Sequence, residues 1–153
     1  MSDTPQEIWD LYDLNFEVIG EHVRGTEMPE HGYPLVVHVW IRNANGQYLM
    51  SQRSANKKTY PLAWECVGGS VLKGEDSLSG ALRETKEEVG ITLSPNNGKL
   101  ICSYIGRVVN GVRFSDIVDV WSFQYDGSVD LYSATTKEVA QTIWMNKTEI
   151  KEI

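Results

Sequence analysis

Three glutamates crowded into five positions constrain this chain more than any other feature of its sequence. Glu84, Glu87 and Glu88 lie in a segment with helical spacing, where successive residues advance by about 100°, so their carboxylates share one narrow face. Like charges one turn apart destabilise a helix by about 0.2–0.5 kcal/mol, and the helix dipole disfavours anions near the C-terminus. The placement predicts a compensating cation. Two readings fit: a bound divalent ion, or a solvated acidic face paired with Arg83 and Lys86.

The helix itself is predicted over residues 76–89. Its apolar side falls at positions i, i+4, i+7 and i+11, occupied by Leu78, Leu82, Thr85 and Val89. Asp76 or Ser77 can cap its start, and Gly90 can end it. Most other segments alternate like strands: 7–13, 16–25, 32–43, 47–54, 63–69, 99–109, 114–125 and 138–146. A short helix begins within residues 147–153, so the predicted fold class is α+β.

Length and charge limit the classes of function. A chain of 153 residues that is 41% hydrophobic predicts one domain, 1–153, with a real core. The net charge of −7 argues against nucleic acid or an anionic membrane as the main partner. The first ten residues are polar and acidic rather than signal-like, and two cysteines are too few for a disulfide framework. These observations predict a cytoplasmic protein.

The residues from Gly69 to Ile91 resemble the Nudix box of the Nudix hydrolase superfamily. That pattern is Gly, five residues, Glu, seven residues, Arg-Glu, an apolar residue, any residue, Glu-Glu, any residue, Gly and an apolar residue. Eight of the nine defining positions match, and Thr85 stands where an aliphatic residue is usual. The resemblance implies an α/β/α sandwich, with a mixed β-sheet between one long box helix and a short C-terminal helix.

The resemblance also implies a metal site and a reaction. Glu84 and Glu88 would be the main ligands of Mg²⁺ (Mn²⁺ as a substitute), Glu87 a further ligand, and the Gly69 carbonyl would complete the shell. Members of this superfamily cleave a nucleoside diphosphate linked to another group. The chemistry is consistent, because Mg²⁺ offsets the charge on phosphate oxygens and helps to deprotonate an attacking water.

Other positions of the motif imply supporting roles. Glu75 and Arg83 would form a pair that holds the preceding loop to the box helix, and Gly90 closes the motif. Glu138 matches a late glutamate that relatives often carry ahead of a Trp-containing strand. It is a candidate general base or extra metal ligand, and an ordinary surface-loop residue is the alternative reading.

A basic loop carries a second resemblance. Arg53, Lys57 and Lys58 precede Pro61 and Trp64 with the spacing found in type 1 isopentenyl diphosphate isomerases, which share the Nudix fold. There the basic residues grip a diphosphate, which suits the bidentate guanidinium and the compact ammonium. This places the chain in an isomerase-like branch and predicts a small-molecule diphosphate substrate. A solvated turn is the competing interpretation.

Isomerase chemistry makes demands that this sequence does not meet. It needs a cysteine in a Cys-Gly-His segment, whereas Cys66 comes too soon after Trp64 and is followed by Val-Gly-Gly-Ser. It also needs a histidine at the place taken by Pro34. The sequence therefore predicts a hydrolase, with an isomerase-like enzyme and an inactive diphosphate-binding module as alternatives. Because relatives commonly have a longer final helix, a homodimer that completes the missing layer is a further expectation.

Overall fold

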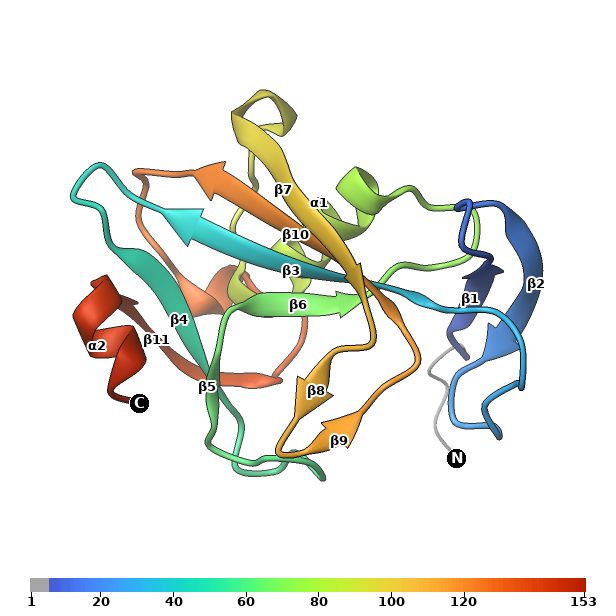
Figure 1. The fold of residues 1–153 in the computed structure, drawn as a ribbon. Coiled ribbons are helices and arrows are strands. Elements are labelled where there is room, and N and C mark those ends of the chain that lie inside the picture. The colour runs from blue at the N-terminus through green and yellow to red at the C-terminus, as the bar shows by residue number, and fades with distance from the viewer. Residues whose placement is uncertain (1–5) are drawn as a thin grey trace.

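One mixed seven-stranded β-sheet organises the molecule (Figure 1). The structure, a computed structural model, describes residues 6–153, so the expectation for the first ten residues falls partly outside it. The strand order is β11-β4-β3-β10-β7, with β5 paired to β4 and β6 paired to β3. The bounds are β3 Leu35–Arg42, β4 Tyr48–Arg53, β5 Trp64–Glu65, β6 Val67–Ser70, β7 Gly98–Ile105, β10 Ile117–Gln124 and β11 Val139–Met145. Strands β3 and β10 run parallel, which confirms the predicted mixed sheet.

The box helix has the predicted boundaries. Helix α1 spans Ser77–Val89, and the Asp76 side chain caps it by accepting a 2.7 Å hydrogen bond from the Ser79 amide. Gly90 ends the helix in the left-handed region with φ 75°, and its N–H donates to the Lys86 carbonyl. Short-range sequence signals therefore placed both ends of α1 correctly.

The core lies between α1 and one face of the sheet. Fully buried side chains from the helix and the strands meet there, including Val37, Val39, Ile41, Ala81, Val89 and Phe123. Thr85 is buried among them, and its hydroxyl donates a 2.8 Å hydrogen bond to the Ala81 carbonyl. The polar residue at this usually aliphatic position is therefore satisfied within its own helix.

The sheet forks where β3 and β4 separate. These strands pair at Arg42 and Tyr48, beside their hairpin turn, and then diverge. Strand β5 stays with β4, whereas β6 crosses to β3, so the segment predicted as one strand over 63–69 is two strands with Cys66 between them. Strand β6 runs away from the fork, so the box loop that follows it starts beside the beginning of β3, where the Val71 amide donates to the Leu35 carbonyl at 2.9 Å (Figure 1).

The predicted strand over 99–109 is also wrong in its second half. Strand β7 ends at Ile105, opposite Ile117 where β10 begins, and the next residue, Gly106, adopts the left-handed region with φ 79°. Strands β8 Val108–Val109 and β9 Val112–Arg113 form a separate small hairpin around Asn110 and Gly111. The turn at Asn110 and Gly111 therefore belongs to this small hairpin and does not join β7 directly to β10.

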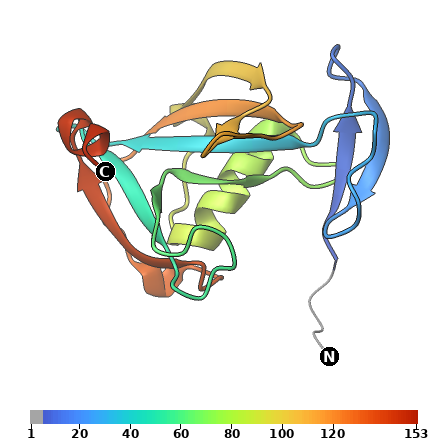
Figure 2. The same ribbon diagram turned by 60° about the horizontal axis from the view of Figure 1, so that its bottom comes forward.

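The second helical layer is thin. Helix α2, Lys147–Lys151, lies at one end of the sheet rather than across its face (Figure 2). On the face opposite α1, an apolar recess is lined by Trp40, Tyr48, Ile101, Val120, Ser122, Lys147, Ile150 and Lys151. Strands β1 Ile8–Tyr12 and β2 Val18–Val23 form a two-stranded N-terminal arm beside the main sheet. Within residues 6–153, no helix has the length and apolar character needed to cross a bilayer.

Candidate active site

Arg83 organises the box residues. Its guanidinium donates to both oxygens of Glu75, at 2.7 and 3.0 Å, and to the Ser70 carbonyl at 2.9 Å. It also donates to Glu84 and Glu87, each at 3.1 Å. The predicted Glu75–Arg83 pair is present, and the same guanidinium fixes the box loop against the helix. Burial opposes the charge of Arg83, but the hydrogen bond to Glu75 and the surrounding carboxylates raise its pKa overall.

Gly69 lies against the carboxylate of Glu84. A Cβ added at position 69 would lie 2.3 Å from Cδ of Glu84, so only glycine leaves room for that carboxylate. Glu84 is 7% exposed. Burial raises its pKa, the guanidinium of Arg83 opposes that shift, and the charge of Glu87 adds to it. The first glycine of the motif therefore makes room for the side chain that is the predicted metal ligand.

Glu88 is the least compensated carboxylate of the site. It is 7% exposed and forms no ion pair with any residue in the described range 6–153. Burial raises its pKa well above the usual glutamate range, and the charges of Glu84, Glu138 and Glu65 raise it further. A buried glutamate without a cation is unfavourable when ionised. A bound positive ion would therefore stabilise the ionised form of Glu88 more than that of Glu84 or Glu87, which already pair with Arg83.

Glu87 lies at the more open side of the same helix face. Its side chain is 36% exposed and is held by Arg83. Its carbonyl accepts hydrogen bonds from the amides of Thr135 and Thr136, so the loop before β11 closes over the C-terminal end of α1. Gly90 is packed beneath that loop, where a Cβ would lie 2.8 Å from the amide nitrogen of Ala134. The second glycine of the motif therefore permits a close loop contact as well as the helix end.

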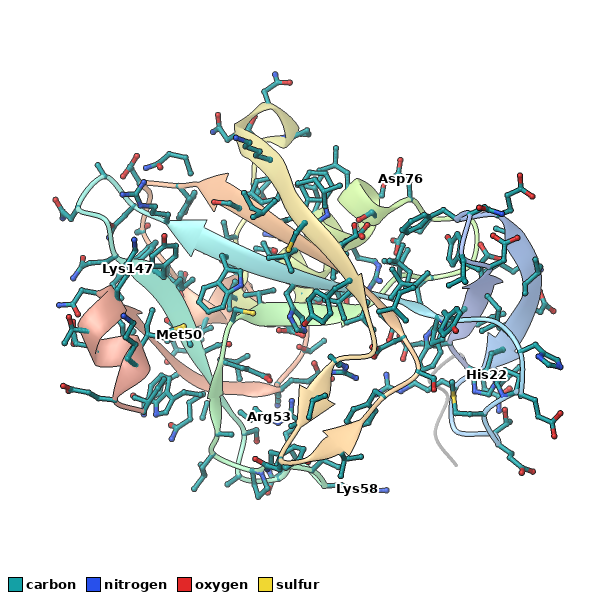
Figure 3. The ribbon with its side chains drawn as sticks, in the orientation of Figure 1. His22, Met50, Arg53, Lys58, Asp76 and Lys147 are labelled. Carbon is teal, nitrogen blue, oxygen red and sulfur yellow. The ribbon has the colours of Figure 1, made fainter. Side chains whose placement is uncertain are left out.

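The clamp loop, residues 54–62, is held by Arg53. The guanidinium donates to the Thr59 carbonyl at 3.0 Å, to the Thr59 hydroxyl at 3.2 Å and to the carboxylate of Glu65 at 3.1 Å (Figure 3). Tyr60 and Leu62 adopt φ of 46° and 64°, which is uncommon for residues with side chains and recurs at ligand clamps. Arg53 thus serves first as a brace for this loop.

Lys57 and Glu138 meet across the clamp loop. Their side chains form a 3.5 Å ion pair, and the Ser54 amide donates to the Glu138 carbonyl at 2.8 Å. The structure therefore joins the predicted substrate-binding lysine to the candidate base. Lys58 differs, because its exposed side chain makes no hydrogen bond or ion pair with the described residues and lies toward the outer end of the loop (Figure 3).

Glu65 is a site residue that sequence reasoning missed. It follows Trp64 on β5, pairs with Arg53 and contributes to the raised pKa of Glu88. Its only sequence signal is its place after the basic loop, three residues before Gly68. Beside it, Cys66 is buried enough that its thiol pKa rises to about 12, which suits a packing residue rather than a reactive thiol.

The charge balance of this cluster leaves room for a divalent cation. The site is made of carboxylates and basic side chains linked by ion pairs and by their electrostatic effect on Glu88. The six carboxylates are those of Glu65, Glu75, Glu84, Glu87, Glu88 and Glu138, and the three basic side chains are Arg53, Lys57 and Arg83. When ionised, the cluster therefore carries excess negative charge. No three His, Cys, Asp or Glu side chains of residues 6–153 are already arranged around one metal position. Arg83 occupies an oxygen of Glu84 and of Glu87, so metal binding requires those carboxylates to turn. The donors are the hard oxygens that Mg²⁺ prefers.

Comparisons with known proteins identify the fold and the family. The NUDIX domain model matches residues 32–153. An uncharacterised Nudix hydrolase of Listeria innocua is 33% identical over 96% of this chain and 84% of its own length. A Deinococcus radiodurans crystal structure aligns with a TM-score of 0.71 at 24% identity, covering 94% of this chain and 86% of that one. A MutT protein structure from Methanosarcina mazei aligns with a TM-score of 0.65 at 26% identity, covering 82% and 86%.

These matches agree with the site built from the residues. The box helix, the glycine that makes room for Glu84 and the arginine that braces the box loop all lie in the matched region. Nudix hydrolases generally use divalent metals, and the oxygen-rich cluster fits such an ion. The chain belongs to the Nudix family and is a pyrophosphohydrolase of the Nudix type.

Proposed function

We propose that this protein catalyses Mg²⁺-dependent hydrolysis of the diphosphate linkage in a nucleoside diphosphate joined to another group, or in a related organic diphosphate. One observation carries the proposal: Glu84 and Glu88 are both nearly buried on one helix face, and Arg83 compensates only the first of them. A diphosphate would add negative charge to a site that already has an excess. Divalent cation and substrate must therefore bind together.

Each group of the site has a proposed role. Glu84 and Glu88 would hold Mg²⁺, with Glu87 and the Gly69 carbonyl as further ligands, and Mn²⁺ would substitute. When bound, the ion offsets charge on the phosphate oxygens and acidifies a bound water. The Glu138 carboxylate would accept the proton of the attacking water as its oxygen bonds to phosphorus and the bridging P–O bond breaks.

The clamp loop would bind the diphosphate. Lys57 can exchange Glu138 for a phosphate oxygen, and this exchange would free Glu138 to act as the base. Lys58 would add charge at the rim. Arg53 would keep the loop in its strained shape and contribute a remaining donor. We expect Arg53→Ala to raise KM more than it lowers kcat, and a loss confined to kcat would contradict a binding role.

The branch within the superfamily also remains a proposal. The clamp-loop sequence supports an isomerase-like branch, while Cys66, with its raised thiol pKa, does not suit isomerase acid–base chemistry. Incubation with isopentenyl diphosphate and Mg²⁺ tests this directly. Formation of the isomeric product would favour the isomerase alternative over hydrolysis.

A substrate screen tests the main proposal. Nucleoside diphosphate sugars, dinucleotides, coenzymes and prenyl diphosphates are incubated with Mg²⁺, and the release of nucleotide or phosphate is followed. We expect turnover of at least one class by the natural protein and almost none by Glu88→Gln. If every class binds with Mg²⁺ and none is cleaved, the inactive binding-module alternative replaces the enzyme.

Two further properties, oligomeric state and location, are also proposed. The open apolar sheet face beside α2 supports a homodimer, which light scattering on the purified protein tests; a monomer at all concentrations would contradict it. The unpaired thiols of Cys66 and Cys102 support a reducing, cytoplasmic location. Localisation of the tagged full-length protein tests that expectation.

A further inference from the structure

The apolar recess on the face of the sheet opposite α1 has the size of a ligand site. Its floor is formed by side chains from β3, β4, β7 and β10, and α2 forms one wall. Trp40 and Tyr48 meet edge to face in it, with ring centroids 5.8 Å apart, and Ile101 and Val120 complete the floor. The recess has a volume of about 430 Å³, within the range of about 300–1,000 Å³ of pockets that bind small molecules. Figure 1 is seen from this side, with α1 behind the strands.

The recess is separated from the glutamate cluster by the sheet itself. Successive side chains of a strand point to opposite faces, and Val39 and Ile41 of β3 pack in the core with α1. Trp40, which lies between them in the sequence, therefore points to the other face. Gly69 lies against Glu84 of α1, so the glutamates belong to the α1 side. A ligand in the recess would not contact the candidate active site.

Helix α2 turns two lysines toward the recess. Lys147, Ile150 and Lys151 occupy positions i, i+3 and i+4, which share one helix face, and all three line the recess. Both lysine side chains are exposed, and neither ammonium forms an ion pair with any residue in the range 6–153. Figure 3 shows Lys147 at the start of α2, beside the strands. Two uncompensated positive charges therefore stand at the edge of an apolar surface.

The neighbouring charges also favour a negative ligand. Lys99 pairs with Ser122 across β7 and β10, and cross-strand partners share a face, so a third ammonium projects from this side of the sheet. The Glu149 carboxylate accepts a hydrogen bond from the Asn146 amide at 3.1 Å in the capping box of α2. Neither Glu149 nor Glu152 lines the recess. In a chain with a net charge of −7, this surface is locally positive and is complementary to an anion.

The lining restricts the rest of the ligand to hydrocarbon. Apart from the lysines, the polar groups of the lining are the hydroxyls of Tyr48 and Ser122 and the indole N–H of Trp40. A base or a sugar buries many polar atoms, each of which needs a hydrogen-bond partner at a fixed position. An aliphatic chain needs none, and the aromatic and aliphatic side chains of the floor suit it. The recess therefore favours a ligand with an apolar tail and a negative head.

We propose that this recess is a second ligand site, which binds an aliphatic chain ending in an anionic group, as in a fatty acid. The chain lies against Trp40 and Ile101, and the anionic group is held by Lys147 and Lys151. The site goes beyond the proposed function, because it lies on the other face of the sheet and requires no hydrolysis. A second copy of the chain would cover the same face, so the ligand and the homodimer partner exclude each other.

Calorimetry with octanoate, octanol and octylammonium tests this inference. These probes share an eight-carbon skeleton and differ in the charge of the head group. Each is titrated into the full chain without Mg²⁺, below the concentration at which micelles form. We expect octanoate to saturate one site per chain and to bind about fivefold more tightly than octanol, as for an exposed ion pair, with octylammonium the weakest. Decanoate should bind about fourfold more tightly than octanoate, since each half-buried methylene adds about twofold.

Three variants locate the bound probe. Replacing both lysines of α2, as Lys147→Gln with Lys151→Gln, should lower the octanoate affinity to that of octanol. The matched control Lys58→Gln removes an exposed lysine of the clamp loop and should leave the affinity unchanged. Ile101→Asp should abolish the binding of both octanoate and octanol. Ile101 is 55% exposed, so this variant should stay folded, which circular dichroism checks.

The results that would overturn the inference are distinct. Equal affinities of the natural protein for octanoate and octanol would show that the lysines hold no anion. A loss of octanoate binding in Lys58→Gln would move the probe to the clamp loop. If no probe saturates a site, the inference also fails, and light scattering that then finds a dimer would make a second copy of the chain the occupant of this face.

Discussion

The substitution Gly69→Ala tests the central geometry of the site. Ordinary van der Waals contact with a Cβ begins at 3.4 Å, whereas this Cβ would lie 2.3 Å from Cδ of Glu84, so the carboxylate must move by about 1.1 Å. Metal–ligand distances tolerate about 0.2 Å, and a displacement of 1 Å in a catalytic group can cost about 10²-fold in rate. We therefore expect kcat/KM to fall about 10²-fold, equivalent to about 2.7 kcal/mol of transition-state stabilisation.

The matched control for this prediction is Gly20→Ala. A Cβ at Gly20 would lie 3.8 Å from the Leu11 side chain, which is ordinary contact, and Gly20 does not need the left-handed region. Steady-state kinetics and Mn²⁺ binding are measured for both variants, with thermal unfolding to confirm that each is folded. If Gly69→Ala keeps the Mn²⁺ affinity and kcat/KM of Gly20→Ala, the contact between Gly69 and Glu84 does not position a metal ligand.

Three other predictions follow from the same contacts. Glu88→Gln should lower kcat by more than about 10²-fold yet raise the Tm of the metal-free protein near neutral pH, because glutamine is neutral without the proton that buried Glu88 must take up; a lower Tm in calorimetry would contradict this. Because the pKa of Glu88 is raised, the metal-free folded protein holds the Glu88 proton more tightly than the unfolded chain does. The contribution of this group to the free energy of unfolding is therefore complete below its usual pKa of 4.5 and is lost as pH rises toward the raised pKa. Mg²⁺ should therefore increase Tm more at about pH 8.5 than at about pH 6, and an equal increase would show that Glu88 does not bind it. Thr85→Val should change the free energy of unfolding by no more than about 1 kcal/mol and leave kcat unchanged, since the lost hydroxyl bonds only to its own helix, and denaturant titration checks this.

Local sequence rules were sufficient for the box helix. Its apolar spacing, the capping residue Asp76 and the terminal Gly90 each act within a few residues, so the boundaries followed without knowledge of the sheet. The same holds for Arg83 and Glu75, which are eight positions apart but joined by a loop whose ends the motif fixes. The grouping of Glu84, Glu87 and Glu88 on one face follows from helix geometry alone.

Contacts between distant strands could not be predicted in the same way. The run from 99 to 109 alternates like one strand, but β7 ends opposite Ile117, where its partner strand β10 begins. The pairing of Arg53 with Glu65 depends on the register between β4 and β5. The meeting of Lys57 with Glu138 depends on β11 lying beside β4. In each case the deciding partner lies on another strand, where sequence periodicity carries no information about register.

The arrangement around Arg83 explains how the fold tolerates its own active site. Glu84 and Glu88 are one helical turn apart, nearly buried, and repel each other when ionised. Among the described residues, Arg83 is the only basic residue that forms an ion pair with either carboxylate, and its partner is Glu84. That single guanidinium is also committed to Glu75, Glu87 and the Ser70 carbonyl, so it stabilises the box loop rather than neutralising the pair. Replacing it by a neutral residue would free the loop and leave the carboxylates without support, whereas a second arginine beside Glu88 would stabilise the fold and occupy the position of the metal. The incomplete compensation is therefore the feature on which we base the proposal that a divalent ion, and with it a diphosphate, binds at this site.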